Sequence, residues 1–261
     1  MALADEFDGF LVDLDGVVWV GGEPIPGAAD ALTALSGAGK EIVFVTNNPG
    51  RPAAAYAERL RGMGVAVTED RVLTAGAATA RLAAERVGVG HTAFTIGADA
   101  FRDEAERAGL EALEGEDGRR ADAVLVSGHR GFDYEELLTA TLALQRGAAL
   151  FATSRDPNLP MPGGAWPGTG AILAAVETAT GKTAEIAGKP ERHLFEMARG
   201  LIGGAERVAM VGDRISSDIE GGRRAGLETV LALSGASTRE EAERADPPPD
   251  HVLDDLAGLL R

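Results

Sequence analysis

Two carboxylates two positions apart, Asp13 and Asp15, lie where the apolar run Phe10 to Val12 meets Gly16. A short apolar run closed by a glycine is typical of a parallel strand buried on both faces, and open α/β sheets bind ligands at the carboxyl ends of such strands. In extended backbone, residues i and i+2 project to the same side. We therefore expect both carboxylates to face one target, with a divalent cation offsetting their repulsion.

Other apolar runs also end in polar residues, and one lysine precedes a helix that Pro190 could begin. The candidate groups at these places are Thr46, Asn47 and Asn48 after 41–45, Asp213 and Asp218 after 207–211, and Lys189. In a parallel sheet the carboxyl ends of the strands share one edge. We therefore expect these groups to converge on Asp13 and Asp15.

This set of side chains fits hydrolysis of a phosphate monoester, which requires neutralisation of spreading negative charge and an aligned attack. Asp13 is predicted to attack phosphorus and form an aspartyl-phosphate. Asp15 is predicted to protonate the leaving oxygen and then to activate water.

The remaining candidates would bind phosphate or metal. The phosphoryl oxygens are predicted to be bound by Thr46, Asn47, Asn48 and Lys189. Mg²⁺ is the predicted cofactor, because carboxylate and carbonyl oxygens and water are its preferred ligands. Its predicted ligands are Asp13, the Asp15 carbonyl oxygen, Asp213 and water molecules, with Asp218 orienting a metal-bound water or Lys189.

Composition excludes several other classes. The chain of 261 residues has no cysteine and four scattered histidines, so disulfides, thiolate nucleophiles and zinc sites are not expected. A net charge of -16 argues against a nucleic-acid surface. Neither a bilayer-length apolar run nor a basic leader followed by an apolar segment is present, so we expect a cytoplasmic protein without a membrane partner.

The balance of charged residues suggests a salty solvent. Only three of the 25 basic residues are lysines, which leaves 22 arginines, and the acidic residues number 41. Arginine enrichment alone could reflect a GC-rich genome. Together with the acidic excess it favours a halophilic adaptation, in which salt screens self-repulsion.

Alternating apolar runs and helical patterns predict an α/β fold: a Rossmann-like, doubly wound parallel sheet with an inserted α/β module. Strands are expected at 10–14, 41–45, 93–96, 123–126, 149–152, 207–211 and 229–233, and helices at 27–39, 53–63, 74–87, 98–108, 134–146 and 170–180. The excursion 17–27 is expected to be hairpin-like, and the segment 253–260 to complete the sheet's edge. A long loop is expected between Thr153 and Thr169, where Arg155, Asp156 and Trp166 would either contact the substrate or brace the module.

Four ordered segments carry a family resemblance: Asp13-Leu14-Asp15-Gly16-Val17, Thr46-Asn47-Asn48, Gly188-Lys189-Pro190 and the stretch from Gly212-Asp213 to Asp218. They resemble the four motifs of the haloacid dehalogenase (HAD) superfamily. More narrowly, the chain resembles the class IIA, NagD-like phosphatases, which include p-nitrophenyl phosphatases. The resemblance implies a catalytic core of 1–72 and 184–261 with an inserted cap of 73–183. One departure is Ser216-Ser217, where the group commonly has Asp-Thr.

The predicted function is Mg²⁺-dependent hydrolysis of small phosphorylated metabolites, such as sugar phosphates, glycerol phosphate, phosphoglycolate or p-nitrophenyl phosphate. A cap closing over the site would exclude protein phosphoesters and would offer a face for a homodimer. Three alternatives stay open: a phosphomutase on the same scaffold, a phosphoacceptor switch, and a binding protein without turnover.

Overall fold

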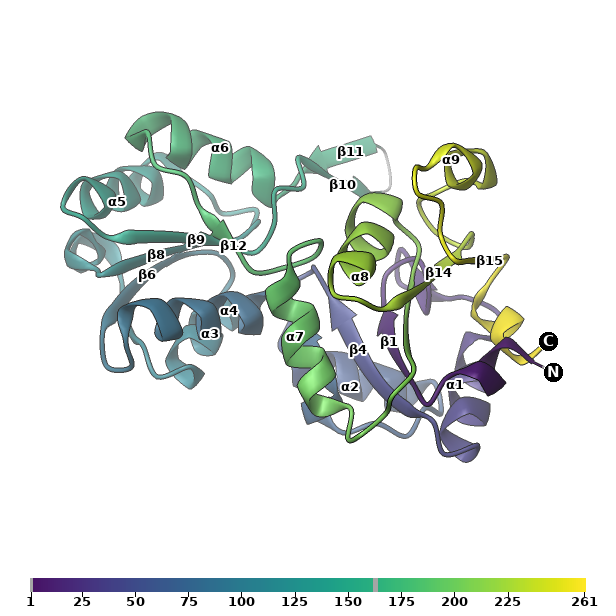
Figure 1. Ribbon diagram of the computed structural model, residues 1–261. Coiled ribbons are helices and arrows are strands. Elements are labelled where there is room, and N and C mark those ends of the chain that lie inside the picture. Colours follow the sequence, from purple (N-terminus) through teal and green to yellow (C-terminus); the bar gives the residue numbers. More distant parts are fainter. Residues whose placement is uncertain (1, 162–163) are drawn as a thin grey trace. The chain divides into compact units, whose positions relative to one another are not determined.

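The computed structural model describes residues 2–161 and 164–261, which form two compact units (Figure 1). Unit 1 comprises Met1–Thr46, Ala53–Leu73 and Lys189–Arg261, and unit 2 comprises Asn47–Pro52 and Thr74–Gly188. Which unit serves as the core and which as the cap stays a prediction, as do the predicted limits of the cap, 73–183.

Unit 1 is built on a six-stranded sheet whose order is β15-β14-β13-β1-β4-β5. The strands are β1 (Gly9–Asp13), β4 (Glu41–Thr46), β5 (Val72–Thr74), β13 (Val208–Gly212), β14 (Glu228–Ala232) and β15 (His251–Leu253). Strand β1 lies between β13 and β4, pairs in parallel with both, and is buried along its whole length. Burial on both faces explains why the residues before Asp13 are continuously apolar rather than alternating.

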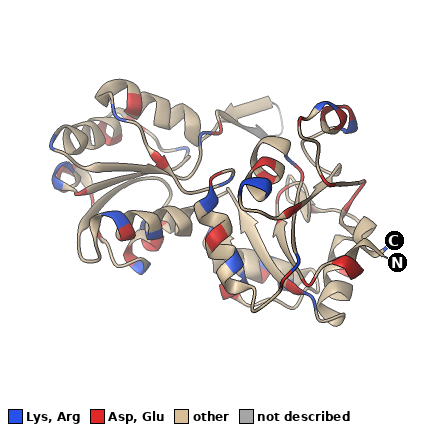
Figure 2. Ribbon diagram, in the orientation of Figure 1, with Lys and Arg blue, Asp and Glu red and all other residues tan. Residues whose placement is uncertain are grey.

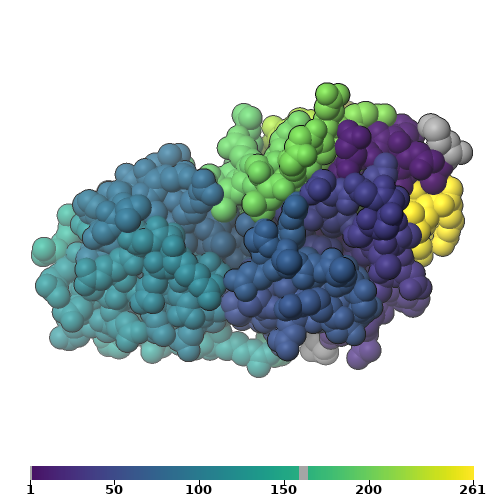
Figure 3. Space-filling view, turned by 90° about the horizontal axis from the view of Figure 1, so that it is seen from below, coloured from purple at the N-terminus to yellow at the C-terminus, as the bar shows by residue number. Residues whose placement is uncertain are grey.

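Helices cover this sheet. They are α1 (Ala28–Gly37), α2 (Ala53–Gly62), α7 (Arg192–Leu201), α8 (Glu220–Arg224) and α9 (Arg239–Arg244). Helix α1 shows the pattern that drives packing, since its buried residues Ala28, Ala31, Leu32 and Leu35 recur at helical spacing. Short turns complete the unit: η1 (Leu3–Glu6), η2 (Glu69–Arg71), η4 (Ile215–Ile219) and η5 (Leu256–Leu260). Turns η1 and η5 lie side by side, so the two ends of the chain meet (Figure 3).

Unit 2 has its own five-stranded parallel sheet, with the order β12-β9-β8-β6-β7. The strands are β6 (Thr92–Ile96), β7 (Glu111–Leu113), β8 (Ala123–Val126), β9 (Ala149–Ala152) and β12 (Glu185–Ile186). The helical elements are α3 (Ala75–Val87), α4 (Asp99–Arg107), η3 (Gly115–Arg120), α5 (Tyr134–Gln145) and α6 (Thr169–Thr180). The Thr74 hydroxyl and the Asp133 carboxylate cap α3 and α5 by accepting from Ala77 N and Glu136 N.

The predicted α/β class with parallel sheets is confirmed, and the excursion after Gly16 forms the hairpin of β2 (Trp19–Val20) and β3 (Glu23–Pro24). Three details of the sequence prediction are wrong. The loop between Thr153 and Thr169 contains an antiparallel pair, β10 (Asn158–Met161) and β11 (Gly164–Pro167), while Pro162 and Gly163 lie outside the described residues. Helix α7 begins at Arg192 rather than at Pro190, and the sheet's edge is β15 (His251–Leu253), followed by a 3-10 turn.

Short strands escaped the sequence analysis because β5, β7 and β12 have only two or three residues each, too few to show a period. Charged residues of both signs occur together on surface elements such as α9, where Arg244 pairs with Glu240 (Figure 2). Within 2–161 and 164–261, none of the helices combines the length and apolarity that crossing a bilayer requires.

Candidate active site

Asp13 is the last residue of β1, and its side chain is buried at the carboxyl end of the sheet. Its Oδ1 accepts a hydrogen bond from Lys189 Nζ at 2.7 Å. Pairing with β4 sets Asp13 beside Val45, so Thr46 follows at the same edge and is itself buried. The sheet register therefore brings two of the predicted groups to one place.

Lys189 joins two separate motifs, because its Nζ also donates to Asp218 Oδ1 at 2.6 Å. Only 3% of this lysine is exposed. Burial alone would lower its pKa, but the charges of Asp13 and Asp218 outweigh that effect and hold the pKa of Lys189 above its ordinary value. The lysine is therefore a permanent cation between two carboxylates.

The loop after β13 supplies the other acids. Asp213 Oδ2 accepts from Ala236 N at 2.6 Å, and Asp218 Oδ2 accepts from Arg214 N at 3.0 Å. Carboxylate oxygens of Asp13, Asp213 and Asp218 all lie within 4.8 Å of one another, and all three residues are buried. The structure thus brings together three of the four predicted metal-binding acids.

Gly16 shows how tightly the chain closes around this cluster. It has φ of +91°, and a Cβ atom there would lie 2.1 Å from Asp213 Oδ2. Both the left-handed backbone and the close approach require glycine. The glycine of the first motif is therefore needed to let Asp213 lie this close to the strand end that carries Asp13.

The buried acids carry more negative charge than Lys189 offsets, since three carboxylates and one ammonium leave a charge of -2. The pKa of Asp213 is raised to about 6, mainly because the carboxyl group is buried and secondly because of the charge of Asp218. Burial, opposed by Lys189, also raises the pKa of Asp13 well above its ordinary value. Such a cluster calls for a further cation, and three carboxylate donors suit a hard divalent ion such as Mg²⁺.

Asp15 differs from Asp13 in being exposed. Its Oδ1 accepts a hydrogen bond from Trp19 Nε1 at 2.9 Å. Trp19 was not among the predicted site residues; its only signal in the sequence is a large aromatic side chain four positions after the second acid, inside a glycine-rich excursion. Local folding therefore provides Asp15 with an anchor that spacing alone did not reveal.

Two predicted phosphate ligands belong to unit 2 rather than to unit 1. Asn47 Nδ2 donates to Asp156 Oδ2 at 3.5 Å, and Asn48 Oδ1 accepts from Gly50 N at 3.1 Å. Both make contacts within their own unit, and their role in phosphate binding stays a prediction.

The loop residues singled out in the sequence also make contacts within unit 2. Arg155 forms a two-pronged ion pair with Glu177 at 2.8 and 2.9 Å. The ring of Trp166 lies under the Arg130 guanidinium, 4.2 Å from its carbon atom. These contacts favour the bracing interpretation of Arg155.

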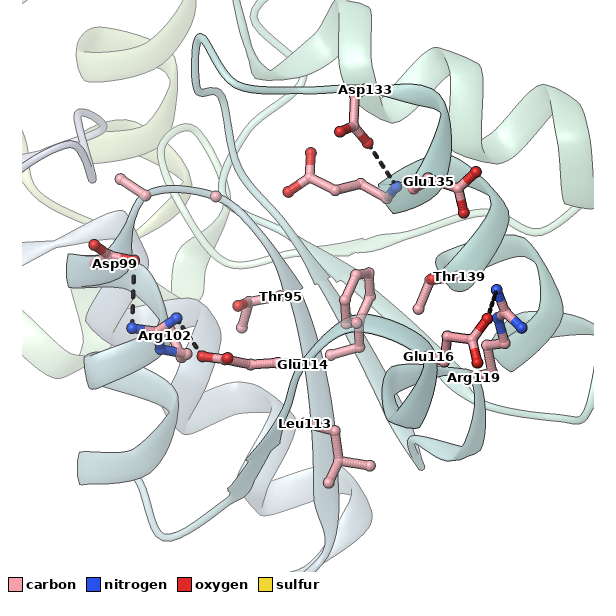
Figure 4. Close-up of a pocket in the computed structure, with 15 residues that line it drawn as sticks. Thr95, Asp99, Arg102, Leu113, Glu114, Glu116, Arg119, Asp133, Glu135 and Thr139 are labelled. Atoms are coloured by element: carbon pink, nitrogen blue, oxygen red, sulfur yellow. Dashed lines mark hydrogen bonds and ion pairs between the residues drawn. The ribbon is translucent and has the colours of Figure 1, made fainter.

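A cavity of about 470 Å³ lies in unit 2, at the carboxyl ends of β6 and β7 (Figure 4). Six carboxylates and two guanidiniums line it, and Figure 4 shows Arg102 between Asp99 and Glu114, with Arg119 beside Glu116. Both arginines are thus already paired. The excess negative charge makes this cavity a poor site for a phosphate ester.

Comparisons with known proteins agree with these observations. A family model of haloacid dehalogenase-like hydrolases matches residues 10–111, and a HAD-hydrolase-like model matches residues 186–259. The glycerol-3-phosphate phosphatase of Gallus gallus is 38% identical over 289 residues, which cover 99% of this chain and 93% of that protein.

Solved structures match just as broadly. A glycerol phosphate phosphatase from Mycobacterium tuberculosis, solved in complex with magnesium, is 34% identical with a TM-score of 0.92, covering 99% of this chain and 78% of that one. The p-nitrophenyl phosphatase from Archaeoglobus fulgidus is 34% identical with a TM-score of 0.89, covering 97% of this chain and 98% of that one.

Proposed function

Because the chain belongs to the haloacid dehalogenase-like hydrolases, as its motifs predicted, we propose that it is a Mg²⁺-dependent phosphatase of small phosphate monoesters. One observation carries the proposal: Lys189 bridges the buried Asp13 and Asp218, with Asp213 beside them, at the edge where Asp15 is exposed.

In the proposed first step, a carboxylate oxygen of Asp13 attacks phosphorus. A bond forms between that oxygen and phosphorus, while the ester bond breaks and its electron pair leaves with the substrate oxygen. Lys189 holds Asp13 Oδ1 through a hydrogen bond, which leaves Oδ2 for the attack. Asp15 gives its proton to the leaving oxygen, so the alcohol departs neutral.

In the second step, Asp15 accepts a proton from water as the water attacks the aspartyl-phosphate. Inorganic phosphate leaves, and the Asp13 carboxylate is restored. Asp13, Asp213 and the Asp15 carbonyl oxygen would hold Mg²⁺, with Asp218 fixing Lys189. When bound, the ion supplies positive charge that screens the nucleophile from the phosphate.

The substrate is proposed to be a small phosphorylated metabolite. Similar proteins bear the names glycerol-3-phosphate phosphatase and acid sugar phosphatase, the latter from Staphylococcus saprophyticus at 32% identity. Glycerol phosphate and sugar phosphates are therefore the first candidates. A cap formed by 73–183, a homodimer through that cap and a cytoplasmic location stay predictions.

The test is phosphate release from glycerol 3-phosphate, glucose 6-phosphate, phosphoglycolate and p-nitrophenyl phosphate, with Mg²⁺ and molar KCl. We expect Mg²⁺-dependent turnover that falls at least about 1,000-fold in Asp13→Asn, because the nucleophile is lost. Asp30→Asn, on the exposed side of α1, is the matched control and should retain activity.

Other outcomes would identify the alternatives. A stable phosphorylated Asp13 without turnover would indicate a phosphoacceptor switch. Transfer of the phosphoryl group back to a sugar hydroxyl, in place of water, would indicate a phosphomutase. Binding of the esters without either reaction would leave a binding protein.

A further inference from the structure

The contact between Trp19 and Asp15 joins a buried donor to an exposed acid. The indole of Trp19 is fully buried, and its Nε1 donates to Asp15 Oδ1 at 2.9 Å. Among residues 2–161 and 164–261, no other side chain forms a hydrogen bond to the Asp15 carboxylate. One oxygen of Asp15 is therefore anchored, and Oδ2 remains for other partners.

Local backbone geometry forces this contact. After Leu14 the chain folds back on itself: Val18 N and Trp19 N both donate to Leu14 O, at 2.9 and 3.3 Å. Gly16 N donates to Trp19 O at 2.7 Å, which closes the turn. The two side chains thus meet across a turn held by main-chain bonds.

Helix α2 holds the indole in place. The Tyr56 ring is stacked on it, with centroids 6.3 Å apart and planes 5° from parallel. The Arg59 guanidinium carbon lies 3.9 Å from the ring centroid, and Arg59 Nη2 donates to Gly22 O at 2.6 Å. Because Tyr56 and Arg59 are three positions apart, they share one face of α2. Stacking and cation–π attraction oppose rotation of the ring.

We propose that Trp19 is a positioning residue that determines which oxygen of Asp15 carries the transferred proton. This inference rests on the proposed phosphatase function. An oxygen that accepts an N–H bond keeps that lone pair occupied, so the proton of the acid resides on Oδ2. In the first step the Oδ2–H bond breaks as the leaving oxygen takes the proton, and the ester bond to phosphorus breaks at the same time.

A simpler interpretation is that Asp15 only satisfies a buried indole N–H, as buried tryptophans require. The two interpretations differ in their dependence on the leaving group. An alkyl oxygen leaves poorly without a proton, whereas p-nitrophenolate is a stable anion that leaves without one. A positioning role predicts selective loss with alkyl esters, and a packing role predicts equal loss with both esters.

The experiment measures kcat/KM for glycerol 3-phosphate and p-nitrophenyl phosphate in the wild type and in Trp19→Phe. This ratio covers the steps up to phosphoryl transfer, so hydrolysis of the shared aspartyl-phosphate does not affect it. We expect a loss of about 10- to 100-fold with glycerol 3-phosphate, the range of one charge-assisted hydrogen bond, and less than about threefold with p-nitrophenyl phosphate.

Four further variants serve as controls. Site-specific replacement of Trp19 by β-(benzothiophen-3-yl)alanine keeps the bicyclic shape and removes only the N–H donor, in case Trp19→Phe folds poorly. Arg59→Met removes the cation over the ring but keeps the N–H donor, so kcat/KM for the two esters should change by the same small factor. Asp15→Asn should show the same selectivity as Trp19→Phe, and the double variant should add little.

Equal losses with both esters, or none, would overturn the positioning role while leaving the phosphatase proposal intact. If the wild type hydrolyses neither ester, the phosphatase proposal fails and the role of Trp19 fails with it.

Discussion

The two units contain similar parallel sheets, but the charged side chains at the carboxyl edge are buried in unit 1 and exposed in unit 2. In unit 1, the side chains of Asp13, Lys189 and Asp218 are 9%, 2% and 1% exposed. In unit 2, Arg102 lies between Asp99 and Glu114, whose side chains are 88% and 69% exposed. Water screens the second set and not the first, so burial, rather than the presence of acids, separates reactive chemistry from a solvated surface.

The buried acids of unit 1 lower the stability of the fold as well as serving its chemistry. The buried acids of unit 1 repel one another and have raised pKa values, led by burial, at Asp13 and Asp213. An arrangement that destabilises the metal-free fold persists where it serves chemistry. The exposed pairs of unit 2 cost little and contribute little.

The largest expected difference comes from Lys189→Met. Removing this cation leaves two buried carboxylates without their partner, so we expect the free energy of unfolding to fall by about 3 to 5 kcal/mol in EDTA. The matched variant Lys182→Met, on an exposed lysine of unit 2, should change it by less than about 0.5 kcal/mol. Urea unfolding measures both values. Small decreases of similar size in the two variants would show that the buried ion pairs stabilise the fold no more than an exposed lysine does.

Asp213→Asn should have the opposite effect on stability. The pKa of Asp213 is raised to about 6, so ionisation costs folding free energy that grows as pH rises from about 4 to about 6. In EDTA at pH 7.5 the variant should be more stable than the wild type by about 2 to 3 kcal/mol, while Mg²⁺-dependent turnover is lost.

The pH profile is the check on that prediction. At pH 4.5 the wild-type Asp213 carries its proton for most of the time, so the stability difference should shrink by half or more. A difference that stays constant from pH 4.5 to 7.5 would mean that the charge of Asp213 is not its source.

A smaller effect is expected at the exposed edge of unit 2. Arg102→Met removes two surface ion pairs and should lower the free energy of unfolding by no more than about 1 kcal/mol. Arg81→Met, which removes one exposed pair with Glu85 on α3, is the control. A loss of several kcal/mol in Arg102→Met alone would contradict the distinction between the two edges.

The smallest effect on stability, counted per charged residue, is expected from a change in salt concentration. With a net charge of -16, the protein should melt at a higher temperature in molar KCl than in dilute buffer, because screening relieves repulsion among surface acids. The destabilisation by Lys189→Met should be nearly the same at both salt concentrations, because its carboxylates are buried. A wild-type melting temperature that does not change with KCl concentration would contradict the halophilic interpretation.

The sequence by itself determined the elements and the chemical groups. Apolar runs located β1, β4 and β13, and helical spacing located α1 and α3, because period and hydrophobicity are local properties. The order of Asp13, Thr46, Lys189 and Asp213 was enough to predict a HAD-type hydrolase. Strands of two or three residues and the hairpin inside 153–169 were missed, since so few residues show no period.

Tertiary structure alone decided which groups meet and what surrounds them. Lys189 reaches Asp13 across 176 positions of sequence, although it lies on none of the strands beside β1 and instead precedes α7. Burial at the sheet's edge, and not residue type, gives Asp13 and Asp213 raised pKa values. Desolvation and neighbouring charge depend on packing in three dimensions, and linear spacing does not encode that packing locally.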